Sequence, residues 1–149
     1  MIATIILVAV TIAVTVSAAL WIAGIYGQYT GFERIEIPVA YCMSNPGVNN
    51  SKWGIFLSLK NGGSNPSRIL YIMVNGILVS ENNISAGGSL SSPDSIGTTL
   101  PSEGMSIESG ETVDVYIWIG EDLFSSGTSV SINLHSVSGI EYVKLLKLL

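Results

Sequence analysis

The first 32 residues contain no charged side chain, and the first charged residue of the chain is Glu33. A helix rises about 1.5 Å per residue, so about 20 consecutive apolar residues are enough to cross the hydrocarbon core of a bilayer. This stretch is longer than that, and a protein in water cannot leave so much apolar surface uncovered. Either lipid or other copies of the segment must therefore cover residues 1–32, and the function depends on which of them does.

The other 117 residues, 33–149, suit one domain with one core. They are rich in Ser, Gly, Asn and β-branched residues, a composition typical of β structure. We therefore expect an α+β chain. A hydrophobic N-terminal α-helix spans 1–32, and an all-β, immunoglobulin-like sandwich spans 33–149.

Composition argues against several classes of function. The net charge is −5, with only six Lys and Arg and no basic cluster, so nucleic acid is not an expected partner. Cys42 is the single cysteine, which excludes an intrachain disulfide and a thiolate zinc cluster. His135 is the single histidine, and no nucleophile motif lies near it. We expect no enzyme, metal or cofactor, with Cys42 a small buried hydrophobe and His135 a structural residue.

Alternating apolar residues predict the strands. Clear strands are expected over 33–41, 53–60, 69–74 and 112–119, and Pro38 places the first of them at an edge or a bulge. Asn75-Gly76 predicts a tight hairpin. Short irregular strands are expected around Ile84, 96–100 and 105–107. About seven short strands with turns between them indicate a sandwich.

The last hairpin can be aligned from its turn. With Ser138-Gly139 as the turn, facing residues have numbers that add up to 277. This alignment places Leu134 opposite Val143 and His135 opposite Tyr142, so that one face of the pair is apolar.

Small residues recur at every fourth position of the N-terminal helix. That spacing places them along one ridge, where two helix backbones can approach closely. Gly31 is also expected to end or loosen the helix. The predicted packing residues are Ala9, Ala13, Ser17, Ala19, Ala23, Gly27 and Gly31.

Three interpretations of the segment are open. A cleaved secretory signal has a basic start and a shorter apolar core of about 7 to 15 residues, and this segment has neither. A permanent single-span anchor is the second. The third is a helix that first spans the membrane and then packs with copies of itself in a filament, which we favour. The lack of basic residues before the apolar run also fits a chain whose leader has been removed.

Together these features resemble the archaeal type IV pilins, the group that includes the archaellum filament proteins. The residues that carry the resemblance are TIILVAVTIAV (4–14), WIAG (21–24) and SINLHSVSGIEY (131–142). Bacterial relatives have a glutamate at the fifth mature position, whereas this chain has Ile5. A buried carboxylate is costly without a partner, and its absence fits the apolar cores of archaeal filaments.

The resemblance implies a structural role. A prepilin peptidase would remove a leader, and an assembly ATPase with a platform protein would move subunits from the membrane into a helical filament of identical copies. The helices would form the core of an extracellular pilus for adhesion, and the β domains its surface. The alternatives are an archaellum filament subunit that serves swimming, or a membrane-anchored β-sandwich that binds a partner.

Two N-glycosylation sequons fall in predicted loops, at Asn49 (Asn-Asn-Ser) and Asn83 (Asn-Ile-Ser), and a glycan is expected on at least one of them. The densest acidic region has no EF-hand spacing, so a solvated edge is expected there rather than a calcium site. Its members are Glu108, Glu111, Asp114, Glu121 and Asp122.

Overall fold

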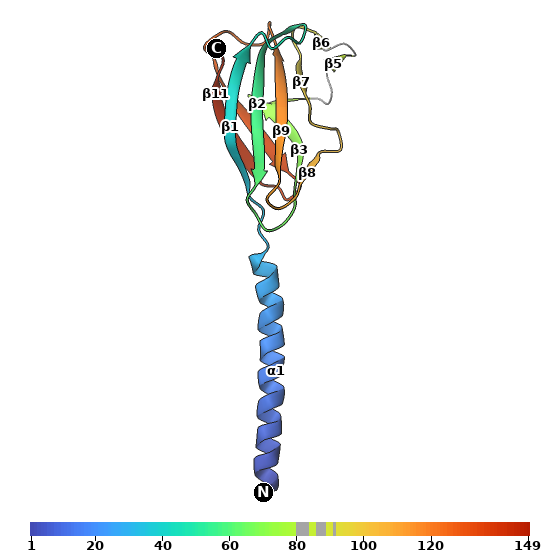
Figure 1. Cartoon of the computed structure of the whole chain (residues 1–149), viewed down its shortest axis with the longest axis vertical. Helices are drawn as coiled ribbons and strands as arrows, with labels where there is room; N and C mark the ends of the chain where they lie inside the picture. Colours follow the sequence, from blue (N-terminus) through green and yellow to red (C-terminus); the bar gives the residue numbers. More distant parts are fainter. Residues whose placement is uncertain (80–83, 86–88, 91) are drawn as a thin grey trace. The chain divides into compact units, whose positions relative to one another are not determined.

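The chain divides into two compact units, Met1–Phe32 and Glu33–Leu149, in a computed structural model that describes residues 1–79, 84–85, 89–90 and 92–149 (Figure 1). The first unit is the helix α1, Ile2–Thr30. Thr4, Thr11, Thr15 and Ser17 each donate a hydroxyl hydrogen bond to a carbonyl three or four residues earlier. Their polar groups are thus satisfied within the helix, as an apolar environment requires.

Gly31 does not belong to the helix. α1 ends at Thr30, and Gly31 has an extended backbone with φ −79° and ψ 106°. Including Gly31 among the packing residues of the helix was therefore wrong, because the fourfold spacing holds only while the backbone stays helical. The other six members of the ladder lie on α1.

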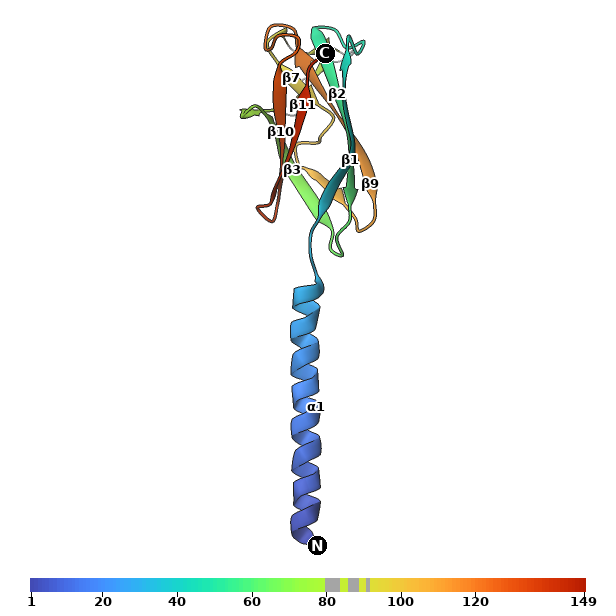
Figure 2. The same cartoon turned by 90° about the vertical axis from the view of Figure 1, so that its left-hand side faces the viewer.

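The second unit is a sandwich of two antiparallel sheets (Figure 2). The first sheet has the order β1 (Ile35–Ser44), β2 (Ser51–Asn61), β9 (Thr112–Gly120), β7 (Ile96–Thr98). The second sheet has the order β11 (Glu141–Lys147), β10 (Ser129–Ser136), β3 (Ser67–Val74), β4 (Ile77–Leu78), and β8 (Met105–Ile107) also pairs with β3. The short strands β5 (Ile84–Ser85) and β6 (Ser89–Leu90) pair with each other. The predicted α+β architecture, an apolar helix followed by a β-sandwich, is confirmed.

The core lies between the two sheets. Trp53, Ile55 and Leu57 of β2 are fully buried, and so are Ile132 and Leu134 of β10 from the facing sheet. Every buried apolar side chain that the structure describes belongs to the stretch from Ile35 to Leu148, and none lies on α1. The β domain therefore has a core of its own that does not depend on the helix.

Local turn chemistry matches the sequence. Asn75 and Gly76 both have positive φ, 49° and 81°, as the tight turn between β3 and β4 requires. β1 is an edge strand, and its pairing with β2 shifts between Glu36 and Val39, around Pro38. The predicted hairpin and the predicted position of Pro38 are both confirmed.

The predicted alignment of the last hairpin is wrong by one residue. Leu134 pairs with Tyr142 rather than Val143, and His135 pairs with Glu141. The turn is longer than predicted, since Ser136 N donates to Ile140 O. A shift of one residue exchanges the faces of a strand, so Val143 and Leu145 point away from the core and are 56% and 70% exposed.

Candidate functional site

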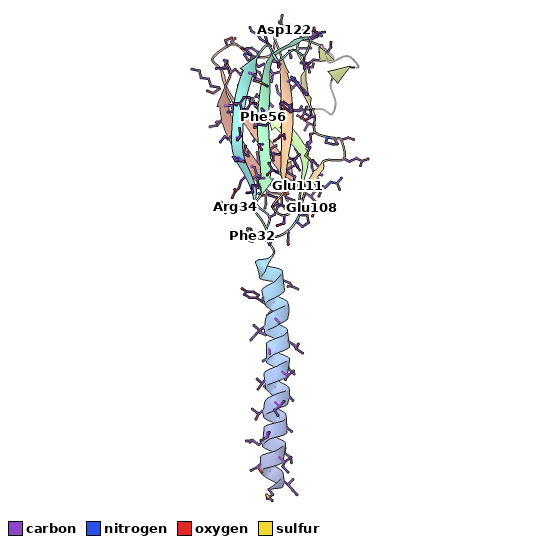
Figure 3. All side chains as sticks on the ribbon, viewed as in Figure 1. Phe32, Arg34, Phe56, Glu108, Glu111 and Asp122 are labelled. Carbon is purple, nitrogen blue, oxygen red and sulfur yellow. The ribbon has the colours of Figure 1, made fainter. Side chains whose placement is uncertain are left out.

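α1 presents a long, continuous apolar surface. The stretch Ile2–Gln28 has the length and composition of a membrane span, with a mean hydropathy of 2.6, and no part of it is buried within the chain. Figure 3 shows side chains leaving the helix on all sides. A helix that is apolar around its whole circumference must be surrounded, either by lipid or by other protein.

The six predicted packing residues on α1 share one side of the helix. Ala9, Ala13 and Ser17 form one ridge, and Ala19, Ala23 and Gly27 form a second ridge. Ala9 and Gly27 are separated by about five whole helical turns, so the two ridges share one side of α1. Ala18 lies midway between Ala9 and Gly27, about two and a half turns from each, and thus points to the opposite side.

Glu33, the first residue of the β domain, is held by three hydroxyls. Ser67 Oγ donates to Glu33 Oε1 at 2.5 Å, Ser136 Oγ donates to the same oxygen, and Ser138 Oγ donates to Oε2. The hydroxyls come from β3 and from the β10–β11 hairpin, so Glu33 ties the start of β1 to the opposite sheet. Nothing in the sequence near Glu33 pointed to this cluster, because its partners are 34 to 105 residues away.

Burial acts to raise the pKa of Glu33, but the hydrogen bonds from Ser136, Ser138 and Ser67 outweigh it and bring the pKa below its ordinary value of 4.5. The folded state thus favours the carboxylate. Glu33 stabilises the domain at every pH above the unfolded carboxyl pKa, and this stabilisation is lost as the pH falls through the lower, folded pKa.

We expect Glu33→Gln to lower the free energy of unfolding of the β domain by about 1 kcal/mol at pH 7. The variant should also lose less stability than the parent chain when the pH is taken from 6 to 3. Thermal unfolding followed by near-UV circular dichroism measures both. Glu36→Gln is the matched control, because Glu36 makes an exposed ion pair with Arg34, at 3.1 Å. An equal loss in the two variants would contradict the role of the hydroxyl cluster.

Four aromatic rings form a row on the outer side of the first sheet. Tyr41, Phe56 and Tyr116 lie side by side on β1, β2 and β9, with ring centroids 4.9 and 5.2 Å apart, and Trp118 stacks on Tyr116 at 5.9 Å. Figure 3 labels Phe56 on this sheet. This row was not predicted from the sequence. Finding it requires the pairing of three strands.

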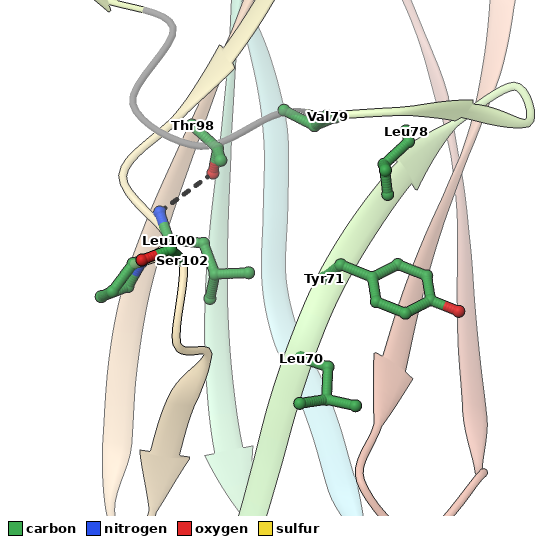
Figure 4. Close-up of a pocket in the computed structure, with 8 residues that line it drawn as sticks. Leu70, Tyr71, Leu78, Val79, Thr98, Leu100 and Ser102 are labelled. Carbon is green, nitrogen blue, oxygen red and sulfur yellow. Dashed lines mark hydrogen bonds between the residues drawn. The ribbon is translucent and has the colours of Figure 1, made fainter.

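A cavity of about 400 Å³ opens beside the β3–β4 hairpin (Figure 4). Leu70, Leu78 and Leu100 give it an apolar lining, and Leu100 N donates to Thr98 Oγ1 at 3.2 Å. Among the residues that the structure describes, the lining includes no carboxylate, histidine or cysteine. The lining residues are Leu70, Tyr71, Leu78, Val79, Thr98, Leu100, Pro101 and Ser102.

The acidic residues do not form one site. Glu108 and Glu111 precede β9 and Asp122 follows it, so they lie at opposite ends of the domain (Figure 3). All five residues of this region are exposed, as a solvated edge requires. Among the residues that the structure describes, no three His, Cys, Asp or Glu side chains are close enough to hold a metal ion.

The remaining predicted residues are placed as follows. Asn49 is exposed in the β1–β2 loop, and its carbonyl accepts a hydrogen bond from Leu90 N at 2.9 Å. Asn83 lies outside the described residues, and glycosylation of either asparagine stays a prediction. His135 is a partly buried strand residue that stacks on Tyr71, with centroids 4.6 Å apart. Cys42 is a free thiol, only partly buried, that packs against the core.

No known family profile and no curated protein matches this sequence. Among solved structures, the chain is similar to the archaellum periplasmic stator protein FlaG from Sulfolobus acidocaldarius, with 18% identity and a TM-score of 0.46. That match covers 76% of this chain and 99% of the other. The complex of the stator proteins FlaF and FlaG from the same organism also matches, with 18% identity, a TM-score of 0.46, and coverage of 76% and 89%. These values are too low to transfer a role to this chain.

Proposed function

We propose that this chain is a non-enzymatic structural subunit of an archaeal surface filament of the type IV pilus class. Its helix α1 would span the cytoplasmic membrane before assembly and pack against the helices of identical subunits afterwards. The β domain would then form the extracellular surface of the filament and serve in attachment. The processing peptidase, ATPase and platform protein implied by the resemblance would be its assembly partners.

One observation carries the proposal, namely that α1 is apolar on every side and contributes nothing to the core of its own chain. Its covering must come from outside the chain. Lipid is as apolar as a helix bundle, so apolarity alone does not favour the bundle over the membrane. The two small-residue ridges favour the bundle over the membrane, because they allow helix backbones to approach closely on the side of α1 that carries the ridges. When each subunit makes the same contact with the next and the series does not close into a ring, the product is a fibre.

Isolation of surface filaments tests the proposal directly. Surface filaments are sheared from cells that produce the chain, and the filament and membrane fractions are compared by mass spectrometry. The chain should be a main component of the sheared filaments. If it stays with the membranes and is absent from the filaments, it is not a filament subunit. Deletion of the gene, scored for attachment and for swimming, then separates a pilus from an archaellum.

We expect Ala9→Leu and Gly27→Leu each to reduce the yield of sheared filaments by about tenfold, because a larger side chain separates the helix backbones at the ridge. Ala18→Leu is the matched control, since it makes the same kind of change on the opposite side of α1. The yield of filament protein, normalised to total chain in the cells, measures the effect. Equal losses from the three variants would contradict a packing role for the ridges.

A second candidate is a membrane-anchored β-sandwich that binds a partner outside the cell. The observation that favours it is the length of the apolar stretch, since the 27 residues of Ile2–Gln28 match a single span. In that case the chain would stay in the membrane fraction after shearing, and the ridge variants would behave like Ala18→Leu.

A further inference from the structure

Both outer faces of the sandwich carry exposed apolar side chains. On the first sheet the aromatic row of Tyr41, Phe56, Tyr116 and Trp118 includes two exposed rings, Tyr41 at 45% and Tyr116 at 37%, and two partly exposed ones; Val39 of β1 is exposed as well. The second sheet exposes Val143 and Leu145 of β11, which we call the aliphatic strip, and also apolar residues of β3 and β4. The two faces lie on opposite sides of the core. Clustered apolar side chains on an outer face are typical of surfaces that bind another protein.

We propose that the aromatic row of one copy of this chain binds the aliphatic strip of a neighbouring copy. This contact joins β domains and is additional to the helix packing proposed above. The rings of the row are held by one another, so little side-chain freedom is lost on binding. Tyrosine and tryptophan are also the residues most enriched at the centres of protein interfaces.

Charge complementarity indicates that the partner is a second copy. Asp114 is the next outward residue before Tyr116 on β9, and Lys147 is the next outward residue after Leu145 on β11. Both side chains are exposed. Each charge lies two residues, about 7 Å, from its apolar neighbour along the strand. When Leu145 of one copy contacts Tyr116 of the next, Lys147 can therefore lie beside Asp114.

Other charged residues lie near these faces, and exposed Lys52 of β2 is one of them. Glu141, at the far end of the aliphatic strip, already accepts a hydrogen bond from Asn133 and lies 3.6 Å from His135 Nε2. Glu36 and Lys60 face each other across β1 and β2, at the charged end of the first sheet. Each copy carries the aromatic row on one side and the aliphatic strip on the other. The contact is thus heterologous and can repeat from copy to copy.

Disulfide cross-linking in the full chain tests which faces meet. Two differently tagged forms are expressed together in a Cys42→Ser background, one with Asp114→Cys and the other with Lys147→Cys. The expected product is a mixed disulfide dimer that joins the two tags, with no dimer from either form alone. A dimer of Asp114→Cys with itself would show that two aromatic rows meet, and the absence of any mixed dimer would also overturn the proposal.

Charge reversal gives an independent readout. Asp114→Lys and Lys147→Glu should each lower the mixed cross-linking of a neighbouring cysteine pair, Tyr116→Cys with Leu145→Cys, by about fivefold. The two reversals together should restore the mixed cross-linking to within about twofold of its level without the reversals. Failure of restoration, with the unfolding midpoints unchanged, would contradict the pairing. If the mixed disulfide forms in membranes but the cells make no filaments, the contact between β domains is supported and the filament function is contradicted. If the cells make filaments in which the mixed disulfide does not form, the filament function is supported and the contact is contradicted.

Discussion

Ile12→Arg is expected to remove the chain from both the membrane and the filament fraction. Ile12 lies near the middle of the apolar stretch, where an arginine costs about 2.5 to 3.5 kcal/mol on insertion scales. Inside a bundle of apolar helices the same charge would have no partner, and its burial would be costly as well. Alkaline extraction of membranes, followed by immunodetection of the membrane and sheared fractions, measures the loss.

The matched control for this change is Gln28→Arg. It introduces the same charge at the end of the apolar stretch, where the side chain can reach the interface. The unfolding midpoint of the β domain should stay the same in both variants, because α1 supplies no core residue. Normal membrane retention of Ile12→Arg would contradict the role assigned to α1 in both candidate functions.

Trp53→Ala is expected to destabilise the β domain by about 3 to 5 kcal/mol, the usual cost of removing a large buried side chain. Trp53 is fully buried on β2, and its indole Nε1 donates to Leu149 O at 3.0 Å. The loss is a large part of the roughly 5 to 15 kcal/mol that stabilises a typical domain. Urea unfolding of the isolated domain 33–149, followed by circular dichroism, measures it.

Trp118→Ala is the control, since Trp118 points to the opposite, outer side of the same sheet and is partly exposed. We expect it to cost about 1 kcal/mol. Trp53→Phe separates the hydrogen bond to Leu149 from the packing of the ring and should cost less than Trp53→Ala. Equal losses for Trp53→Ala and Trp118→Ala would mean that the core is not where the structure places it.

The features that sequence predicted well are those carried by neighbouring residues. The helix follows from an unbroken apolar run, and the β3–β4 turn follows from Asn75-Gly76, whose positive φ values few other residues adopt easily. Most strands follow from alternation, because a strand half-buried against one core must alternate. The bulge around Pro38 follows from the missing amide hydrogen of proline.

The errors arose where the prediction depended on pairing over a distance. Taking Ser138-Gly139 as a two-residue turn placed Val143 on the wrong face, because the backbone bond from Ser136 to Ile140 closes a longer turn. The error at Gly31 was local instead: the helix ends at Thr30, as the expected helix-ending role of Gly31 indicates, so Gly31 cannot also continue the fourfold ridge.

The sequence alone determined that residues 1–32 need a covering from outside the chain, since no partner in residues 33–149 could bury an all-apolar helix of that length. Only the tertiary structure decided what the β domain presents to its surroundings. The pairing of β1, β2 and β9 brings Tyr41, Phe56 and Tyr116 into one row, and the pairing of β10 with β11 turns Val143 outward. The physical reason is that periodicity is a local property of the chain, whereas a surface is set by which strands lie side by side.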